Sequence, residues 1–274
     1  MSVLTSLAGF ATLSVLLLIL YFTLQRGIGR LLFDQDGNFS LSAWYSLTPA
    51  AGIEGGGFAN AMLGTIIVVT IATVIAFPLG VVAGVFLSEF PNTWFSSTIR
   101  FAIKVLTGVP SIISGVFAYG LLVVTFGGYS ALAGGVALSV LELPTIILTT
   151  EEAMRLVPTD VRAAAFSLGA NRAQTTLRVI FPAALPVILT GTTIAIARGA
   201  GETAPLLFTA AFSFFWPTAQ FATQPIATVS VMIYNFALVP FENQVELAWA
   251  ASLVLVLIVL VASVCFRVLV KPKI

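Results

Sequence analysis

Long runs of apolar residues, separated by polar or glycine- and proline-rich stretches, account for most of this 274-residue chain. Each run is long enough to cross a hydrocarbon core of roughly 30 Å as a helix, because a helix rises about 1.5 Å per residue. The pattern therefore predicts an all-α membrane protein with six transmembrane helices. The predicted spans are residues 7–25, 60–88, 99–126, 131–150, 186–212 and 246–268.

The composition supports a membrane protein and excludes several kinds of chemistry. Apolar residues make up 59% of the chain and charged residues only 8%, whereas a soluble domain carries about 25% charge. The first span has no basic segment before it and no clear cleavage site after it, so we expect it to be retained. With no histidine in the chain, histidine-based catalysis and metal binding are excluded, and a net charge of +1 gives no indication of nucleic-acid binding.

The distribution of lysine and arginine predicts the orientation, because cytoplasmic loops carry an excess of both. With the N-terminus inside, the outer segments 26–58 and 213–245 hold only Arg26 and Arg30. We therefore expect both termini to be cytoplasmic. The first outer segment is expected to be a loop, and the second a loop with some re-entrant or interfacial structure. The cytoplasmic cations are Arg100, Lys104, Arg155, Arg162, Arg172, Arg178, Arg267, Lys271 and Lys273.

The loop 151–185 differs from the rest of the chain because it is polar and patterned. Thr159 is expected to cap a first helix, and Gly169 suits the left-handed position after its end. Asn171 begins a second helix, with Gln174 completing a capping box, and Pro182 is expected to end it. The sequence thus predicts a compact pair of short helices on the cytoplasmic side.

The apolar residues of this helix pair indicate what it contacts. The first helix has a face of small residues around Ala164 and Ala165, and the second has a stripe of Leu177, Ile180 and Phe181. A helix lying on the membrane surface is the alternative, but such helices favour bulky anchors. Alanines and a glycine favour a fitted cleft in a protein partner.

Here the sequence resembles the permeases of type I ABC importers, which carry the pattern E-A-A, three residues, G, nine residues, I-x-L-P. The segment RAAAFSLGANRAQTTLRVIFPAALP (162–186) matches it in several positions and departs at Ala163, where the family often has Glu, and at Phe181, where it often has Leu. The resemblance implies a coupling helix that docks in a groove of a cytoplasmic ATPase. The residues it implies for ATPase coupling are Ala163, Ala164, Ala165, Leu168, Gly169, Ala170 and Pro182.

Further stretches resemble the permeases of Pst-type phosphate importers, and ARGAGETAPLLFT (197–209) is most similar to the PstA type. The other stretches are residues 64–90, GVPSIISG (108–115) and TTEEAMRLVP (149–158). The resemblance implies a division into residues 1–59 (first helix and outer loop), a five-helix permease core at 60–268, and a short cytoplasmic tail at 269–274. It also implies a PstB-like cytoplasmic ATPase dimer, a second, PstC-like permease and an extracytoplasmic PstS-like phosphate-binding protein, within membrane lipid.

One charged pair is expected inside the fifth span. Arg198 lies roughly 18 Å into that span, and a charge there costs at least about 2.5 kcal/mol. Glu202 is four residues on, so the two side chains can pair on one face. The pair could simply fix helix position. The alternative is a gate for an oxyanion, because the planar donors of arginine match phosphate oxygens, and the family resemblance implies the same role.

Other features remain open in the sequence. Gly191, Ala195 and Gly199 recur every four residues and permit close helix packing, as do Gly80 and Gly84. Glu142, in the fourth span, suits a packing role as well as a functional one. Pro78 and Pro110 are expected to bend their helices.

Three classes of function compete. The chain contains no G-x-x-x-x-G-K-[ST] motif, so an ATP-driven importer would need a partner that hydrolyses ATP with Mg, and this chain would be a non-catalytic permease with no cofactor of its own. An ion-coupled secondary transporter would favour repeated halves, which are not visible. An intramembrane protease lacks the necessary histidine or intramembrane aspartates. Within the first class, phosphate follows from the resemblance, and sulfate, molybdate or phosphonate are the alternative substrates.

Overall fold

The computed structural model describes the backbone of residues 2–34 and 36–269, and the side chains of residues 5–34, 36–261, 263 and 264. The described chain is helical, with one isolated β-bridge between Phe33 and Phe39. The predicted tail 269–274 lies outside the described residues except for Leu269. The helices are α1 (Ser2–Leu32), α2 (Ser42–Tyr45), α3 (Ala59–Glu89), α4 (Trp94–Gly108), α5 (Ser111–Ala118), α6 (Val124–Phe126), α7 (Ala131–Leu156), α8 (Thr159–Ser167), α9 (Arg172–Thr175), α10 (Phe181–Gly201), α11 (Ala204–Thr209), α12 (Val229–Ala237) and α13 (Glu242–Leu269), with π-helical turns η1 (Tyr119–Val123) and η2 (Thr176–Ile180).

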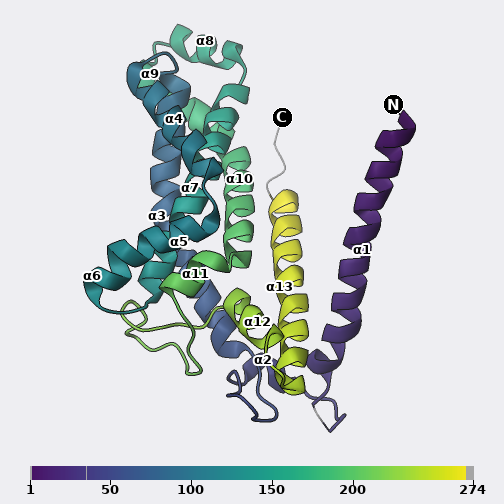
Figure 1. Ribbon diagram of the computed structural model, residues 1–274. Helices are drawn as coiled ribbons and strands as arrows, with labels where there is room; N and C mark the ends of the chain where they lie inside the picture. Colours follow the sequence, from purple (N-terminus) through teal and green to yellow (C-terminus); the bar gives the residue numbers. More distant parts are fainter. Residues whose placement is uncertain (1, 35, 270–274) are drawn as a thin grey trace.

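The helices form a bundle with one peripheral helix (Figure 1). In the bundle α3, α7 and α10 pack together, and α4 lies against α3 and α7. Beside it α13 packs on α10 and α12, while α1 contacts α13 and is otherwise almost fully exposed. The short helices α8 and α9 cap one end of the bundle, and the loop after α11 lies at the other end. The beginning of α1 and the end of α13 both point toward the end that carries α8.

Glycines bring the backbones of the central helices close together. A methyl group added at Gly84 of α3 would lie 2.5 Å from Cβ of Thr150 in α7, and one at Gly135 of α7 would lie 2.4 Å from Ile71. Similarly, a methyl group at Gly191 of α10 would lie 2.5 Å from Thr149. Small residues permit this approach where helices pack in a membrane. The packing role predicted for Gly84 and Gly191 is therefore confirmed.

Most of the predicted spans correspond to helices of the structure. Five helices in the described residues are long and apolar enough to cross a membrane, and a bent pair makes a sixth. The predicted spans 60–88 and 131–150 match α3 and α7 closely. The first span is longer than predicted, because α1 continues to Leu32 into the segment expected to be a loop. The second outer segment contains α12, which packs on α13.

The prediction of one span at 99–126 is wrong in geometry. The chain forms α4 and a second piece, Ser111–Phe126, that meet at an angle of 105°. Pro110 has no amide hydrogen and disfavours helical geometry in the residue before it. Val109 accordingly adopts an extended conformation, with φ −74° and ψ 126°. The bend expected at Pro110 is therefore much sharper than a kink and divides the span.

The prediction of a span at 186–212, preceded by a separate helix ending at Pro182, is also wrong. One helical stretch runs through α9, η2 and α10 from Arg172 to Gly201. Pro182 lies at the second position of α10, directly after η2, whose wider turn accommodates a residue without an amide hydrogen. The helix ends instead at Gly201, Glu202 after it is extended, and α11 begins at Ala204. Pro205 explains this break, because it cannot donate to the carbonyl of Gly201.

We expect Gly84→Val to destabilise the bundle. The added side chain would collide with Thr150 and with the backbone carbonyl of Ile147, which cannot rotate away. Overpacking of this kind costs about 1–3 kcal/mol. The measurement is the thermal unfolding midpoint of the detergent-solubilised protein. Gly9→Val is the matched control, because no atom lies within 4 Å of a methyl group added at Gly9; equal midpoints for the two variants would contradict the packing assignment.

Candidate functional site

The segment from α8 to α9 has the capped geometry predicted from its sequence. Gly169 lies in the left-handed region with φ +84°, and the amide of Ala170 donates to the carbonyl of Ala165 at 3.1 Å, as at other glycine-terminated helix ends. The capping box is present, with the amide of Gln174 donating to Asn171 Oδ1 at 2.9 Å and the amide of Asn171 donating to Gln174 Oε1 at 3.0 Å. The cap predicted at Thr159 is wrong: α8 begins at that residue.

The residues predicted to contact an ATPase lie mostly on the outside of this segment. Leu168 has 89% of its surface exposed, whereas Ala165 is the one buried residue of α8. On the following helix, Leu177 is exposed and Ile180 is fully buried. The other members of the predicted set are exposed at Ala163, Ala164, Gly169 and Pro182 and half-buried at Ala170. Because exposed apolar groups gather here, the segment offers a surface suited to a protein partner.

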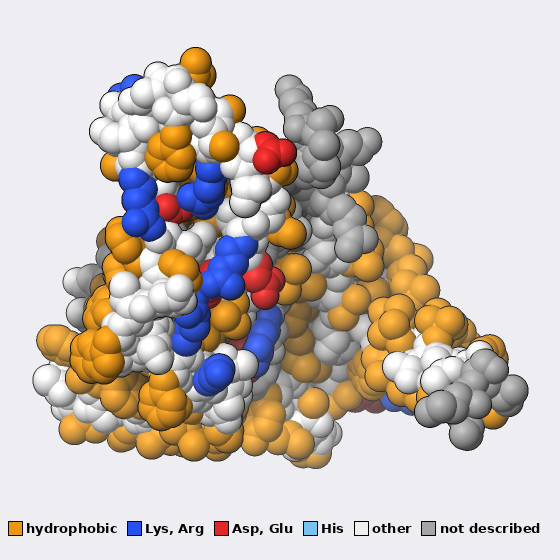
Figure 2. All heavy atoms as spheres, turned by 90° about the horizontal axis from the view of Figure 1, so that it is seen from above, with side chains coloured by type: hydrophobic (Ala, Val, Ile, Leu, Met, Phe, Trp, Pro, Cys, Tyr) orange, Lys and Arg blue, Asp and Glu red, His pale blue; other side chains and the backbone are white. Residues whose placement is uncertain are grey.

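Basic side chains collect on the face of the molecule that carries this segment. Figure 2 shows Lys and Arg side chains spread across that face, with acidic side chains between them. Two of the acids are nearly buried, Glu89 at the end of α3 and Glu151 near the end of α7. Glu89 accepts from Arg162 Nη1 at 2.6 Å, and Glu151 accepts from Arg100 Nη2 at 2.6 Å. Carboxylates therefore join α4 and the segment from α8 to α9 to the bundle. This segment, residues 159–175, is named the coupling segment below after its predicted role.

The predicted pair of Arg198 and Glu202 forms at the break that ends α10. Arg198 Nε donates to Glu202 Oε1 at 3.4 Å. The Arg198 side chain is 62% exposed, whereas that of Glu202 is 17% exposed. The main-chain carbonyl of Glu202 accepts the hydroxyl of Ser230 at 2.9 Å, which holds the break against α12. Arg198, whose donors are only partly used, thus faces one side of the bundle.

The neighbours of this pair place it at the middle depth of the bundle. Gly199 packs on Glu142, since a methyl group at Gly199 would lie 2.7 Å from Glu142 Oε1. Glu142 lies in the middle of α7, is 2% exposed, and accepts the hydroxyl of Thr73, near the middle of α3, at 3.4 Å. Its other oxygen is buried without a hydrogen-bond partner. The sequence left the role of Glu142 open; the structure places it against Gly199, the residue that follows Arg198.

The short helices that follow the two breaks lie against one another. A methyl group added at Gly115 of α5 would lie 2.6 Å from Cα of Pro205 in α11, so the short helices that follow both breaks are in close contact. Ser114 Oγ donates to the carbonyl of Ala137 in α7 at 2.7 Å and fixes α5 to the bundle. Backbone at membrane depth that is not helical is tolerated where it is buried in protein or lines an aqueous cavity. The paired breaks therefore mark the region where a pathway through the bilayer is expected.

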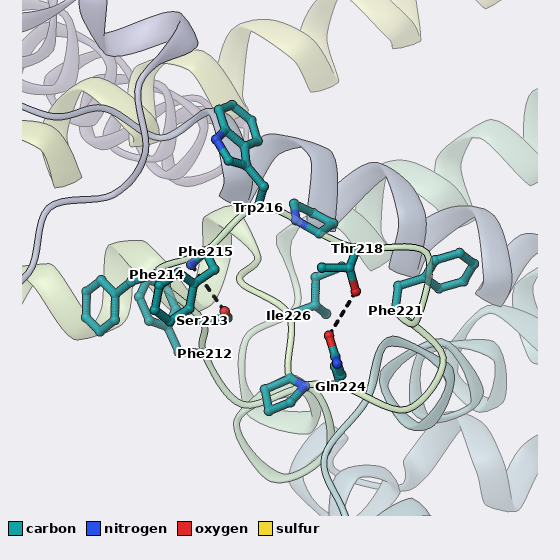
Figure 3. Close-up of a pocket in the computed structure, with 11 residues that line it drawn as sticks. Phe212, Ser213, Phe214, Phe215, Trp216, Thr218, Phe221, Gln224 and Ile226 are labelled. Carbon is teal, nitrogen blue, oxygen red and sulfur yellow. Dashed lines mark hydrogen bonds between the residues drawn. The ribbon is translucent and has the colours of Figure 1, made fainter.

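A hollow lies at the opposite end of the molecule from α8, in the loop after α11. It has a volume of about 580 Å³ and none of its 11 lining residues is charged. Figure 3 shows Phe215 and Trp216 among its aromatic side chains, with Thr218 Oγ1 donating to Gln224 Oε1 at 2.9 Å across the loop. An uncharged, aromatic lining does not suit an oxyanion, so this hollow does not compete with the charged break.

The fold and the charged break together define a multi-pass helical membrane permease. Residues 76–272 match the family described as "Binding-protein-dependent transport system inner membrane component". The solved structure titled "Inward facing conformations of the MetNI methionine ABC transporter: CY5 native crystal form" has a TM-score of 0.59 and 20% identity, covering 77% of this chain and 91% of that one. The architecture is accordingly that of type I ABC importer permeases.

Curated relatives give the particular family. The "Phosphate transport system permease protein PstA" of Yersinia pestis is 40% identical, over 94% of this chain and 84% of its own length. The protein of the same description from Pasteurella multocida (strain Pm70) is 36% identical, over 100% of this chain and 94% of its own length. The chain therefore belongs to the family of binding-protein-dependent transport permeases, and within it to the PstA type.

Sequence reasoning missed the anchoring role of Glu89 and Glu151. Glu89 was assigned to no site, and Glu151 marked only the beginning of a loop. A usable signal was present, because both acids lie at the ends of long apolar helices that the sequence predicts to be cytoplasmic, and arginines are abundant in the same predicted loops. A carboxylate at such a position needs a cationic partner once it is buried.

We expect Gly199→Ala to destabilise the break, because the new methyl group would displace Glu142 or the end of α10. The measurement is again the unfolding midpoint in detergent. Gly201→Ala is the matched control in the same helical turn, since nothing lies within 4 Å of a methyl group there. Combining Gly199→Ala with Glu142→Ala should restore part of the lost stability; strictly additive losses would show that the two residues do not interact.

Proposed function

We propose that this protein is the permease subunit of an ATP-driven importer that moves inorganic phosphate into the cytoplasm. The assignment of phosphate as the substrate rests on the similarity to curated phosphate transport permeases over nearly the whole chain. The geometry of the break supports an oxyanion in general, and sulfate, molybdate and phosphonate remain the alternatives on chemistry alone. An ion-coupled secondary transporter has no comparable support.

Arg198 and Glu202 would act as the gate of this pathway. A guanidinium facing lipid at middle depth costs about 2.5 kcal/mol or more, so the exposed face of Arg198 requires water or a second protein chain. A second, PstC-like permease covering this face would place Arg198 beside a pathway between the two subunits. There the free donors of Arg198 can bind phosphate oxygens, and Glu202 keeps the arginine paired in the absence of substrate.

The energy would come from a PstB-like ATPase dimer that binds and hydrolyses ATP with Mg. This chain contains no phosphate-binding loop motif, so it offers no site for the nucleotide. The exposed apolar residues of the coupling segment fit the groove of such a partner, and the bends at Val109 and Glu202 provide the flexible elements. A PstS-like binding protein would deliver phosphate from outside. The α8 end, and with it both termini, would be cytoplasmic because basic residues dominate there.

We expect Arg198→Gln to abolish phosphate uptake in vesicles containing the assembled complex and ATP. The substitution removes the charge and the planar donors that bind the anion, while the surrounding packing is unchanged. Arg198→Lys should retain a small part of the activity, because a lysine keeps the charge and loses the two-pronged geometry. Arg26→Gln is the control, since Arg26 lies on α1 against Trp249, outside the break. Normal uptake by Arg198→Gln would refute the gate assignment.

We expect Leu168→Glu to weaken the attachment of the ATPase at least tenfold. Leu168 is the most exposed apolar residue of the coupling segment, and a carboxylate there would be desolvated on docking. Co-purification of the ATPase with the tagged permease measures the effect. Leu168→Met is the conservative control and should co-purify normally. Undiminished co-purification by Leu168→Glu would mean that the ATPase docks elsewhere.

A further inference from the structure

The last residue of α3, Glu89, has a network of contacts that the gate and the docking surface do not explain. Its side chain is 6% exposed, and both carboxylate oxygens have cationic partners. Oε1 accepts from Arg162 Nη1 at 2.6 Å, and Oε2 accepts from Arg172 Nε at 3.4 Å. The main-chain carbonyl of Glu89 accepts from Arg172 Nη2, and the guanidinium of Arg172 lies 4.3 Å from the ring centroid of Phe90.

The two arginines lie on either side of the break in the coupling segment. Arg162 belongs to α8 and Arg172 is the first residue of α9, with the left-handed turn at Gly169 between them. Apolar packing contributes little to holding α8, because Ala165 is its one buried residue. The bond from Arg162 to Glu89 is thus a principal link between α8 and the long helices.

The turn between α3 and α4, which follows Glu89, is also held by contacts from α4. Arg100 of α4 donates to the carbonyl of Leu87 at 3.3 Å and to that of Pro91 at 2.9 Å. It also donates to Glu151 at 2.6 Å, which in turn accepts from Arg155 at 2.6 Å. Residues 87–91 are therefore bound to α8 and α9 on one side and to α4 and α7 on the other.

From this turn, α4 leads directly to the sharp bend at Val109. The short helix beyond the bend contacts α11, which follows the break carrying Arg198 and Glu202. Because helices are stiff along their axes, a displacement of the coupling segment that moves the α3–α4 turn also moves the bend at the far end of α4. The bent pair is the element with room to change its angle, and shear and hinge motions of this kind are common in switching proteins.

We propose that Glu89 is the positioning residue that transmits movement of the coupling segment, through the α3–α4 turn and α4, to the helix breaks of the gate. The inference rests on the proposed function, since it requires an ATPase that moves α8. Neutralising Glu89 leaves two arginines without their shared counter-charge, so α8 loses its ion pair with the turn, while α9 stays in place as the first turn of the stretch that continues into α10. The bundle itself is held by the glycine contacts of α3 with α7 and remains assembled.

The test uses the complete reconstituted complex and compares Glu89→Gln with wild type. Four quantities are measured: assembled complex, basal ATPase rate, stimulation of the ATPase by phosphate-loaded binding protein, and phosphate uptake. We expect assembly and basal hydrolysis to be retained, while stimulation and uptake each fall at least tenfold. Glu89→Asp should recover part of both, because it restores the charge. The control is Glu152→Gln, an exposed acid at the same end, which should resemble wild type.

The outcomes separate this inference from the function on which it rests. Wild-type stimulation and uptake by Glu89→Gln would overturn the role of Glu89 and leave the importer intact. A wild-type complex that neither imports phosphate nor hydrolyses ATP would instead overturn the proposed function. Should Glu89→Gln fail to assemble, the charge-balanced Glu89→Gln/Arg162→Gln variant replaces it. That variant supports the inference if it assembles without stimulated hydrolysis, and overturns it if it transports normally or also fails to assemble.

Discussion

The close approach of α3 to α7 is the constraint on which the rest of the structure depends. In a bilayer, lipid tails are as apolar as the side chains, so association relies on tight packing rather than on burial from water. Gly80 and Gly84 of α3 receive the β-branched side chains of Ile146 and Thr150 of α7. Once these two helices are fixed, the ends nearest α8 hold Glu89 and Glu151 where arginines bind them.

α10 depends on the same surface. Gly191 and Gly199 pack on Thr149 and Glu142 of α7, so the depth of Arg198 is set by α7 rather than by the length of its own helix. The sequence predicted Arg198 in the middle of its span, whereas in the structure it lies near the end of α10, at the level of Glu142 in the middle of α7. The helical stretch begins at Arg172, so α9 and η2 form its first turns.

The sequence predicted the elements whose signal is local. The long apolar runs, the left-handed turn at Gly169 and the capping box at Asn171 follow from composition and short-range hydrogen bonding. The break after Gly201 was missed because the apolar pattern continues through α11 without interruption, and hydropathy does not distinguish a bent path from a straight one. At Pro182 the sequence predicted a helix end that is not there. The wider π-helical turn before it accommodates the missing amide hydrogen, so the helix continues.

The site shows the same division. The pair of Arg198 and Glu202 could be predicted because its two members are four residues apart. The contacts of Glu89 with Arg162 and Arg172 could not be predicted, because the two arginines lie 73 and 83 residues after Glu89 in the sequence. Their approach depends on how α8 and α9 are placed relative to the end of α3. The ion pairs of Glu89 also fit the proposal that movement of α8 is transmitted to the helix breaks. α8 has little apolar contact of its own, so ion pairs join it to α3. In the proposal above, α4 transfers a displacement of α8 to the two proline-associated breaks, while the glycine-packed bundle stays in place. A coupling segment buried by apolar packing would instead be fixed in place, and could not respond to a partner without disturbing the core.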